Sequence, residues 1–306
     1  MNYIKDIADY AGSLNCHYIT HCNMSTHTSF KTGGITDIAL FPYDQITLAE
    51  LTDYIHRLEV PLYIIGNASN LLVSDSGIRG AVIFTNQLTA VSAIDETTIQ
   101  AECGASLSKL ANFALKNELT GLEFAYGIPG TVGGAVYMNA GAYGGCIADV
   151  IYTTEYISKL SSLKVLTNPQ HEFDYRHSVF MQNDNLILSS AFKLSKGAPE
   201  QIRAKMDENM RARIAKQPLE YPSAGSVFKR YPGFYTSQLI DEHGLRGRRI
   251  GGAMVSEKHA GFIINYDNAT SRDIYDLIAL VKEEIYRKYN IKLECEIKML
   301  GDFGEA

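Results

Sequence analysis

The chain has 306 residues. Because a domain typically has about 100 to 200 residues, this length suggests two or three domains. Hydrophobic residues make up 46% of the sequence and charged residues 20%, which excludes a disordered chain or a simple linker. The net charge of -6 argues against a general binder of nucleic acid or of anionic membranes, because neither polyanion would be attracted overall.

The cysteines and the apolar runs exclude several further classes of protein. The five cysteines are an odd set without a CxxC pair, so the sequence predicts no disulfide framework, zinc ribbon or other metal site. No apolar run approaches the roughly 20 residues that span a bilayer, and the N-terminal segment lacks the pattern of an export signal. We therefore expect a cytoplasmic protein that makes no membrane contact.

The first elements along the chain alternate between helix and strand. Apolar residues at helical spacing predict a short helix within residues 1–27, which we expect to be an N-terminal extension. Residues 36–41 and 61–66 are predicted strands, and helical spacing over 51–58 predicts a helix between them. We expect these elements to form one compact α/β unit.

The middle of the chain is richer in predicted strands. Strands are predicted at 81–85, 97–104 and 186–194, and Ser106 is the expected N-cap of a helix. The segment 195–199 contains Gly and Pro and precedes another helix with apolar residues spaced by four. We place a domain boundary at the end of this segment.

The last third of the chain combines strand and helix patterns again. A strand is predicted at 261–265, followed by a helix with one apolar face, and a strand at 293–300. The apolar face of that helix consists of Ile274, Ile278, Val281 and Ile285. In the last strand Glu294, Glu296 and Lys298 share one face, which a solvated polar surface would explain.

Two stretches have the composition of anion-binding loops. Glycines interrupt any regular element over residues 127–145, and they would let backbone N–H groups approach a diphosphate or a flavin ring closely. Residues 66–70 form a turn of small and amide residues in which successive N–H groups, with Ser69 and Asn70, could hold an anion. Tight turns and an Asx-rich turn are the alternatives that the residues leave open.

Further candidates for chemistry lie in the second half of the chain. Arg176 stands among aromatic and apolar residues and would suit a carboxylate, although an ordinary ion pair would also explain it. Ser226 lies in a turn-like segment without a GxSxG elbow, so a role as proton donor is less demanding than one as nucleophile. Residues 201–250 carry ten Lys or Arg against five Asp or Glu, which fits either solvated helix faces or a pocket for an anionic ligand.

Taken jointly, these stretches resemble the UDP-N-acetylenolpyruvoylglucosamine reductases, flavoenzymes of the second step towards bacterial peptidoglycan precursors. The motifs that carry the resemblance occur in the family's order over about residues 28–301. They are TSFKTGG, GNASNLLV, LEFAYGIPGTVGGAVYMNAGAYGG, DYRHS, QPLEYPSAGSVFK, IGGAMVSEKHAGFIIN and LECEIKMLG. The chain resembles the shorter branch of the family, because no room is left between Arg176 and Ser226 for the substrate-capping tyrosine loop of the other branch.

The resemblance implies an α+β fold with three parts. A two-subdomain FAD-binding domain of the vanillyl-alcohol oxidase type would cover residues 28–199, with subdomains at about 28–83 and 84–199. A C-terminal α+β substrate-binding domain would cover 200–290, and residues 291–306 would return to the active site as a strand. Separately from the resemblance, we expect a monomer.

The resemblance also implies a cofactor, FAD bound non-covalently, and NADPH as the co-substrate that reduces it. NADPH would then leave, and the enolpyruvyl sugar nucleotide would occupy the same pocket. The residues implied for FAD are Gly66, Asn67, Ala68, Ser69, Asn70, Leu71, Ile128, Pro129, Gly130, Thr131, Gly133, Gly134 and Asn139.

The roles of the catalytic residues follow from the same resemblance. Hydride from flavin N5 would leave an enolic intermediate, which Arg176 and Glu296 would stabilise and Ser226 would protonate. Glu296 would help only if it is protonated or organises a bound donor, since a bare carboxylate would repel an enolate. Tyr175, Lys229 and Arg230 are the implied substrate-binding residues.

Two other functions remain as alternatives. A related flavin oxidase with another alcohol or sugar substrate is permitted by the FAD domain, although SAGSVFK and the strand glutamate argue against it. A non-catalytic protein that binds nucleotide sugars would require the three catalytic residues to have drifted, and all three are present. Cys295 and Lys298 depart from the Pro and Arg that are common in the family, but neither change removes a proposed catalytic group.

Overall fold

The computed structural model describes residues 3–158, 162–183, 185–231 and 233–304, so the outermost ends of the predicted N- and C-terminal segments lie outside it. The chain folds into two compact units. Unit 1 holds the described residues up to Thr20, then Ile38–Asn67 and Ala81–Arg213. Unit 2 holds His21–Asp37, Ala68–Gly80 and the described residues from Ile214 onwards. The predicted domain limits, including the one at residue 199, stay predictions.

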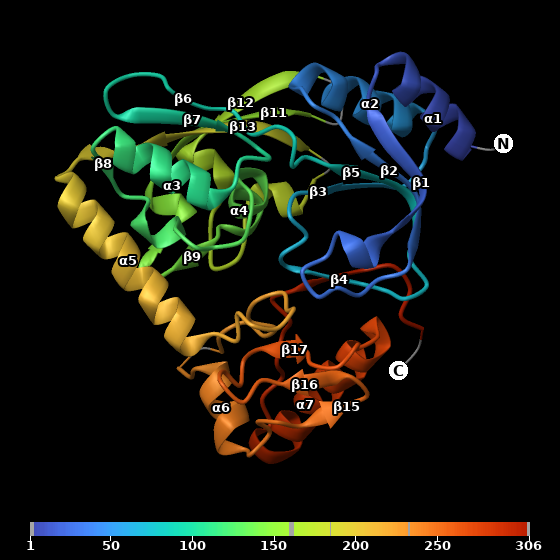
Figure 1. Ribbon diagram of the computed structural model, residues 1–306, viewed down its shortest axis with the longest axis vertical. Helices are drawn as coiled ribbons and strands as arrows, with labels where there is room; N and C mark the ends of the chain where they lie inside the picture. The colour runs from blue at the N-terminus through green and yellow to red at the C-terminus, as the bar shows by residue number, and fades with distance from the viewer. Residues whose placement is uncertain (1–2, 159–161, 184, 232, 305–306) are drawn as a thin grey trace. The chain divides into compact units, whose positions relative to one another are not determined.

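A four-stranded sheet with the order β1-β2-β5-β3 contains the first predicted strands. Its strands are β1 (His17–Asn23), β2 (Ile35–Phe41), β5 (Ile78–Phe84) and β3 (Leu62–Ile65), the last two paired in parallel. Helices α1 (Tyr3–Ser13) and α2 (Gln45–Arg57) lie side by side next to this sheet (Figure 1). Tyr10 of α1 stacks on Tyr54 of α2 with ring centroids 4.0 Å apart. The predicted strands and helix of this region are confirmed.

A five-stranded antiparallel sheet with the order β12-β11-β13-β7-β6 lies within unit 1. Its strands are β6 (Val91–Ala93), β7 (Thr98–Glu102), β11 (Ile151–Ile157), β12 (Leu163–Thr167) and β13 (Leu186–Lys193). Helix α3 (Leu107–Lys116) begins at the predicted cap, where Ser106 Oγ accepts from the Lys109 N–H at 3.1 Å. This hydroxyl satisfies one of the N–H groups that the first helical turn leaves without a partner.

The expectation that glycines exclude regular structure from residues 127–145 is wrong for part of that stretch. Helix α4 (Val132–Met138) runs through Gly133 and packs against β7 and β13. A Cβ built on Gly133 would lie 2.9 Å from the Cβ of Cys103, so only glycine allows this approach. Packing against the sheet therefore offsets the poor helix propensity of glycine.

Shorter pairs of strands and one long helix complete unit 1. β8 (Leu119–Thr120) pairs with β14 (Ser195–Lys196), and β9 (Gly141–Ala142) pairs with β10 (Gly145–Cys146). The helix predicted after residue 199 is α5 (Pro199–Lys216), and proline at its first position is favourable because no N–H bond is lost there. Of its predicted apolar face, Ile202 and Met206 are buried, whereas Ile214 is exposed.

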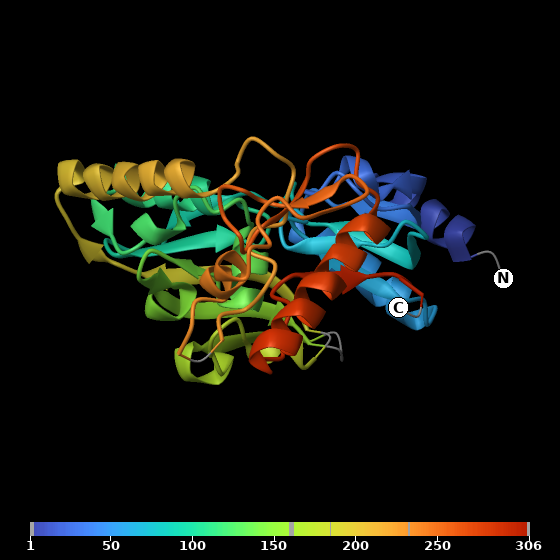
Figure 2. The same ribbon diagram turned by 90° about the horizontal axis from the view of Figure 1, so that it is seen from below.

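Unit 2 is built around a three-stranded antiparallel sheet covered by a helix. The strands are β15 (Arg249–Ile250), β16 (Ala253–Val255) and β17 (Ile263–Asn265), and α6 (Thr236–Glu242) precedes them. Helix α7 (Ser271–Tyr289) lies along this sheet (Figure 2). All four residues of its predicted apolar face are buried. Among the described residues, no helix has the length and apolar character needed to cross a membrane.

The predicted strand at 293–300 is regular only at its end. β18 (Lys298–Leu300) pairs in parallel with β4 (Leu71–Val73), and Lys298 N–H donates to Asn70 O at 2.9 Å. Upstream, Cys295 forms an isolated bridge with Phe228 instead. The segment thus changes partner within three residues and bends there, which hydrophobic alternation cannot reveal.

Candidate active-site residues

The first two residues of one predicted cofactor loop, Gly66 and Asn67, meet the second predicted loop within unit 1. A Cβ built on Gly66 would lie 2.2 Å from Thr131 Oγ1, so glycine is required for this approach. Asn67 Nδ2 donates to the carbonyl oxygen of Pro129 at 2.9 Å. Segments that lie about sixty residues apart in the sequence are therefore held together at the N-terminal end of α4, where Thr131 is the N-cap.

The backbone of the first loop fits a bound anion. Within the part of the chain that the structure describes, the N–H groups of Asn67, Ala68 and Ser69 donate to no protein acceptor. Ala68 adopts a left-handed conformation with φ of 47°, which turns successive N–H groups towards a common point. These groups fit the diphosphate of FAD. Of the remaining predicted residues here, Asn70 Nδ2 donates to Glu296 O at 3.2 Å, and Leu71 begins β4.

The second loop is anchored by its own backbone. Val132 N–H donates to Ala105 O at 2.8 Å, and Gly133 N–H donates to Cys103 O at 2.7 Å. Ile128, Pro129, Gly130 and Gly134 keep some exposed surface. The predicted ring-lining residues therefore stand on a loop fixed to the end of β7 and the start of α3.

Arg176 lies at the tip of a tight turn in unit 1. The backbone groups of Asp174 and His177 bond reciprocally, at 3.1 and 3.3 Å. Arg176 has a φ of 55°, a left-handed conformation that costs a non-glycine residue about 1–3 kcal/mol. Its guanidinium donates to the carbonyls of Asn139, at 3.5 Å, and Gly141, at 3.3 Å, and lies over the ring of Tyr175. The surrounding structure therefore defines the place of this cation.

Asn139 is buried at the C-terminal end of α4, with a left-handed φ of 43°. Its Nδ2 donates to Asp174 O at 3.0 Å, and its Oδ1 accepts from Ala148 N–H at 3.0 Å. Both ends of the amide thus bind protein atoms near Arg176.

Ser226 and Glu296 lie on adjacent segments of unit 2. Glu296 N–H donates to Val227 O at 2.7 Å, and the Ser226 hydroxyl donates to Phe228 O at 3.2 Å. Ser226 also forms an isolated bridge with Phe262 on the opposite side. Unit 2 therefore brings together the predicted proton donor and the predicted glutamate, whereas Arg176 belongs to unit 1.

Basic groups lie beside Glu296 in unit 2. Lys229 Nζ and Glu294 Oε2 form an exposed ion pair at 3.0 Å. Burial lowers the pKa of Lys298, and the charge of Lys229 lowers this pKa further. Sequence reasoning placed Lys298 on the same predicted strand face as Glu296 but assigned it no role. Arg230 lies over the ring of Tyr235.

The other basic residues of the 201–250 segment do not all point to one ligand. Lys205 pairs with Glu208 at 2.9 Å, and Arg246 pairs with Asp241. Solvated faces therefore explain part of the positive charge of this segment. No group of three or more metal-ligating side chains occurs among the residues that the structure describes.

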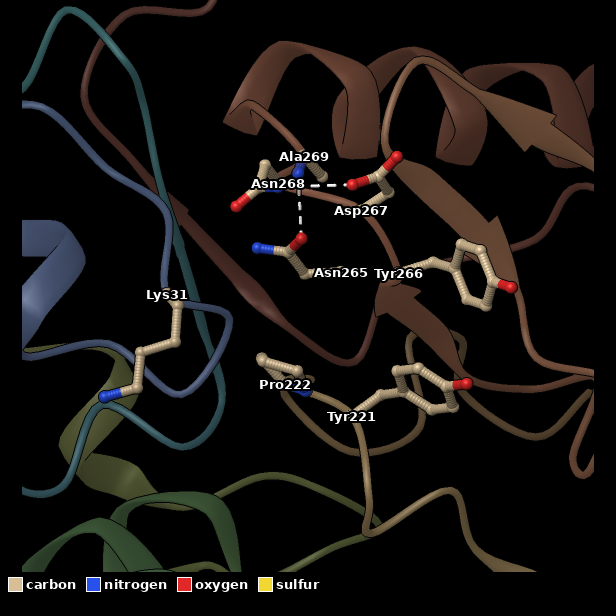
Figure 3. Close-up of a pocket in the computed structure, with 8 residues that line it drawn as sticks. All are labelled: Lys31, Tyr221, Pro222, Asn265, Tyr266, Asp267, Asn268 and Ala269. Atoms are coloured by element: carbon tan, nitrogen blue, oxygen red, sulfur yellow. Dashed lines mark hydrogen bonds between the residues drawn. The ribbon is translucent and has the colours of Figure 1, made fainter.

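A separate pocket of about 430 Å³ opens in unit 2 (Figure 3). The described residues that line it are Lys31, Tyr221, Pro222, Asn265, Tyr266, Asp267, Asn268 and Ala269, and none of these is a predicted site residue. The two tyrosine rings point away from Lys31 in the figure. Asn265 uses its amide within the protein, since Nδ2 donates to Phe30 O and Oδ1 accepts from Ala269 N–H.

Comparison with known families gives two matches along the chain. Residues 36–163 match the family described as FAD binding domain. Residues 217–300 match the family described as UDP-N-acetylenolpyruvoylglucosamine reductase, C-terminal domain.

Individual relatives match almost the whole chain. The reductase of that name from Caldanaerobacter subterraneus subsp. tengcongensis is 46% identical over 279 residues, which are 91% of this chain and 92% of the relative. The one from Latilactobacillus sakei subsp. sakei is 47% identical over 284 residues, 92% and 93% of the two chains. The crystal structure of UDP-N-acetylenolpyruvylglucosamine reductase from Thermus caldophilus has a TM-score of 0.79 and 31% identity, and the match covers 94% of this chain and 99% of that one.

Proposed function

Because the chain belongs to the UDP-N-acetylenolpyruvoylglucosamine reductase family, we propose that it reduces UDP-N-acetylglucosamine enolpyruvate to UDP-N-acetylmuramate with NADPH. This reaction would serve peptidoglycan precursor synthesis. The observation that carries the proposal is the identity of 46% along 91% of the chain.

Family membership confirms three predictions made from the sequence. The resemblance to this family was right, and the protein is an FAD-dependent oxidoreductase. The α+β fold class, with an FAD-binding domain followed by a C-terminal domain, is also confirmed. We further propose that the protein is a monomer and that it is cytoplasmic. The five free cysteines support the second proposal, because a reducing compartment keeps thiols unpaired.

Backbone groups of this chain fit the diphosphate, the most charged part of FAD. We assign the N–H groups of Asn67, Ala68 and Ser69 to the FAD diphosphate, because they lack protein acceptors and lie on a left-handed turn. The loop from Ile128 to Thr131, which Asn67 contacts, would line the flavin. FAD supplies hydride transfer, from NADPH to the vinyl methylene carbon of the substrate.

The proposed catalytic residues act on the charge that this transfer leaves. The guanidinium of Arg176 stays protonated at any working pH and would pair with the negative charge that develops beside the substrate carboxylate. The Ser226 hydroxyl would give its proton to the resulting carbanionic carbon. Glu296 would act as a protonated donor or orient one.

The substrate's fixed negative charges would meet the basic side chains. Lys229 and Arg230 follow Ser226 by three and four residues, and Lys229 is already paired with Glu294. We propose that Lys229, Arg230 and Tyr175 contact the diphosphate or the carboxylate of the substrate. The carboxylate of Glu294 would then be replaced by a substrate anion as the partner of Lys229.

A visible spectrum followed by two anaerobic additions tests this function. The purified protein should show flavin absorbance, which NADPH bleaches and the enolpyruvyl sugar nucleotide restores. A flavin that bleaches but is not restored would remove the substrate assignment and leave the FAD domain. Oxygen consumption with polyols would instead indicate a flavin oxidase.

A further inference from the structure

The turn that carries Arg176 is tied at both ends to the C-terminal end of α4. At its start, Asp174 O accepts from Asn139 Nδ2 at 3.0 Å. Just after its end, the buried Ser178 donates its hydroxyl proton to Tyr137 O at 2.7 Å. The two hydrogen bonds therefore clamp residues 174–178 against the last turn of α4.

Asparagine rather than glycine stands at the end of α4, which indicates that the hydrogen bonds of its side chain matter. Position 139 is left-handed, and glycine would adopt that conformation at lower cost. Glycine would lose the bonds to Asp174 and Ala148, and in this buried place it would leave their polar groups unpaired. The C-cap of α7, Asn290, has a similar φ of 54° at an exposed position and serves as a natural comparison.

The same residue also contacts the Arg176 side chain. The Asn139 carbonyl accepts from Arg176 Nη1, and the Gly141 carbonyl accepts from Nη2. Asn139 thus positions the backbone of the Arg176 turn through Asp174 and the guanidinium through its own carbonyl oxygen.

We propose that Asn139 and Ser178 are positioning residues that hold Arg176 in place for the enolic intermediate. This inference rests on the proposed function, and it assigns the Asn139 side chain to Arg176 rather than to the flavin. The left-handed Arg176 needs such support, because a strained turn persists only where its surroundings hold it. Loosening the clamp should affect the step in which Arg176 acts and spare the step in which NADPH reduces the flavin.

The test measures both half-reactions anaerobically on FAD-loaded variants. Asn139→Asp replaces the amide donor to Asp174 by a carboxylate and adds an ionisable group at a buried position, Asn139→Gly removes both side-chain bonds without adding charge and keeps the left-handed backbone, and Ser178→Ala removes the second tie. We expect each to slow reoxidation by the sugar nucleotide by about 10-fold, the scale of one lost hydrogen bond. Flavin reduction by NADPH and the flavin spectrum should change by less than about 2-fold. Asn290→Gly is the matched control and should change neither rate.

A double-variant comparison separates positioning from general damage. Arg176→Ala alone should slow reoxidation by about 10²- to 10³-fold, as for loss of a charge-stabilising donor. Adding Asn139→Asp to it should cost less than about 2-fold more, because Asn139 acts through Arg176. Additive losses, equal slowing of both half-reactions, or loss of FAD would overturn the proposal.

Amide hydrogen exchange tests whether Asn139 holds the Arg176 turn against α4, and it needs no activity assay. In Asn139→Asp, a peptide spanning residues 172–181 should exchange faster than in the wild type and in Asn290→Gly. Unchanged exchange there would refute the clamp. A wild-type flavin that the sugar nucleotide does not reoxidise would instead refute the proposed function, and the exchange result would still decide the clamp.

Discussion

At the scale of single residues, the local geometry of Ser226 and of His171 leads to one prediction each, about a reaction rate and about the pH dependence of stability. Ser226 is held between Phe262 on one side and the segment of Glu296 on the other, and its hydroxyl donates to a backbone carbonyl. His171 is fully buried and has partners on both ring nitrogens. The first residue is the proposed proton donor, and the second bears on stability.

Ser226→Ala should separate the two half-reactions. Flavin reduction by NADPH should stay within about 2-fold of the wild type, whereas reoxidation should slow by about 10²- to 10⁴-fold, the range for loss of a general acid. Rapid-mixing absorbance at the flavin band measures both rates. Equal losses in both would exclude the proton-donor role, and Ser226→Thr, which keeps a hydroxyl, is the control that should recover part of the rate.

The buried imidazole of His171 predicts loss of stability in acid. Its Nδ1 lies 3.0 Å from Thr167 O and its Nε2 lies 2.8 Å from Thr154 Oγ1, so the neutral ring donates to the carbonyl and accepts from the hydroxyl. Burial lowers the pKa of His171 below its usual 6.5. The unfolded chain therefore binds a proton first as the pH falls, and stability present above pH 6.5 is lost between 6.5 and the lower folded pKa.

Urea unfolding between about pH 8 and pH 5 checks this expectation. In His171→Gln the slope of the unfolding free energy against pH should be smaller, by up to about 1.4 kcal/mol per pH unit for one proton. Burial also lowers the pKa values of His27 and His259, which should preserve part of the slope. The exposed His17, replaced by Gln, is the control, and equal slopes in all three proteins would contradict the assignment.

At the scale of elements, α4 connects the two parts of the predicted site that lie in unit 1. Its N-terminal cap contacts Gly66 of the predicted anion-binding loop, and its C-terminal cap holds the turn of Arg176. This short helix was not predicted, because its glycines argue against a helix when the sequence is considered alone. Its existence depends on the close approach to Cys103.

Two adjacent alanine substitutions in α4 should have opposite effects. Gly133→Ala places a Cβ 2.9 Å from Cys103 Cβ, and overpacking of this kind costs about 1–3 kcal/mol of stability. Gly134→Ala meets only Thr131 Oγ1, at 3.5 Å, so the better helix propensity of alanine should add up to about 1 kcal/mol. Urea unfolding of both proteins without FAD measures the difference, because Gly133 and Gly134 are also predicted FAD residues. A stabilising Gly133→Ala would refute the packing argument.

At the scale of the whole molecule, unit 2 is assembled from segments distant in the sequence. Its core contains Phe30 and Leu72, both fully buried, beside residues of α7. β18 has its partner β4 in the segment Ala68–Gly80. The C-terminal third of the chain therefore lacks part of its own core and one strand partner when it stands alone.

A fragment of residues 200–306 should consequently fail to unfold cooperatively. The loss of Phe30 alone would cost about 3–5 kcal/mol if it resembles truncation of a buried aromatic residue, which is a large part of the stability of a typical domain. Circular dichroism on heating should show a broad change for the fragment and a sharp one for the full chain. A sharp transition in the fragment would show that this third is independent after all.

Sequence reasoning found the elements whose patterns are local. The apolar face of α7 repeats within each turn, Ser106 lies directly before α3, and β2 ends in an apolar run over residues 38–41, so each could be predicted from neighbouring residues. The candidate residues were found in the same way, because motifs such as GNASN and SAGS are short. Their roles stay predictions that the experiments above address.

The sequence by itself determined the family, the FAD cofactor and the α+β class, since ordered motifs along the chain carry that information. Only the tertiary structure decided that Gly66 lies against Thr131, that α4 is a helix, and that residues 293–300 change partner at Cys295. The physical reason is that these features depend on contacts between residues distant along the chain. The intrinsic helix or strand propensity of a residue contributes less free energy than such packing, so the tertiary contacts decide the local structure.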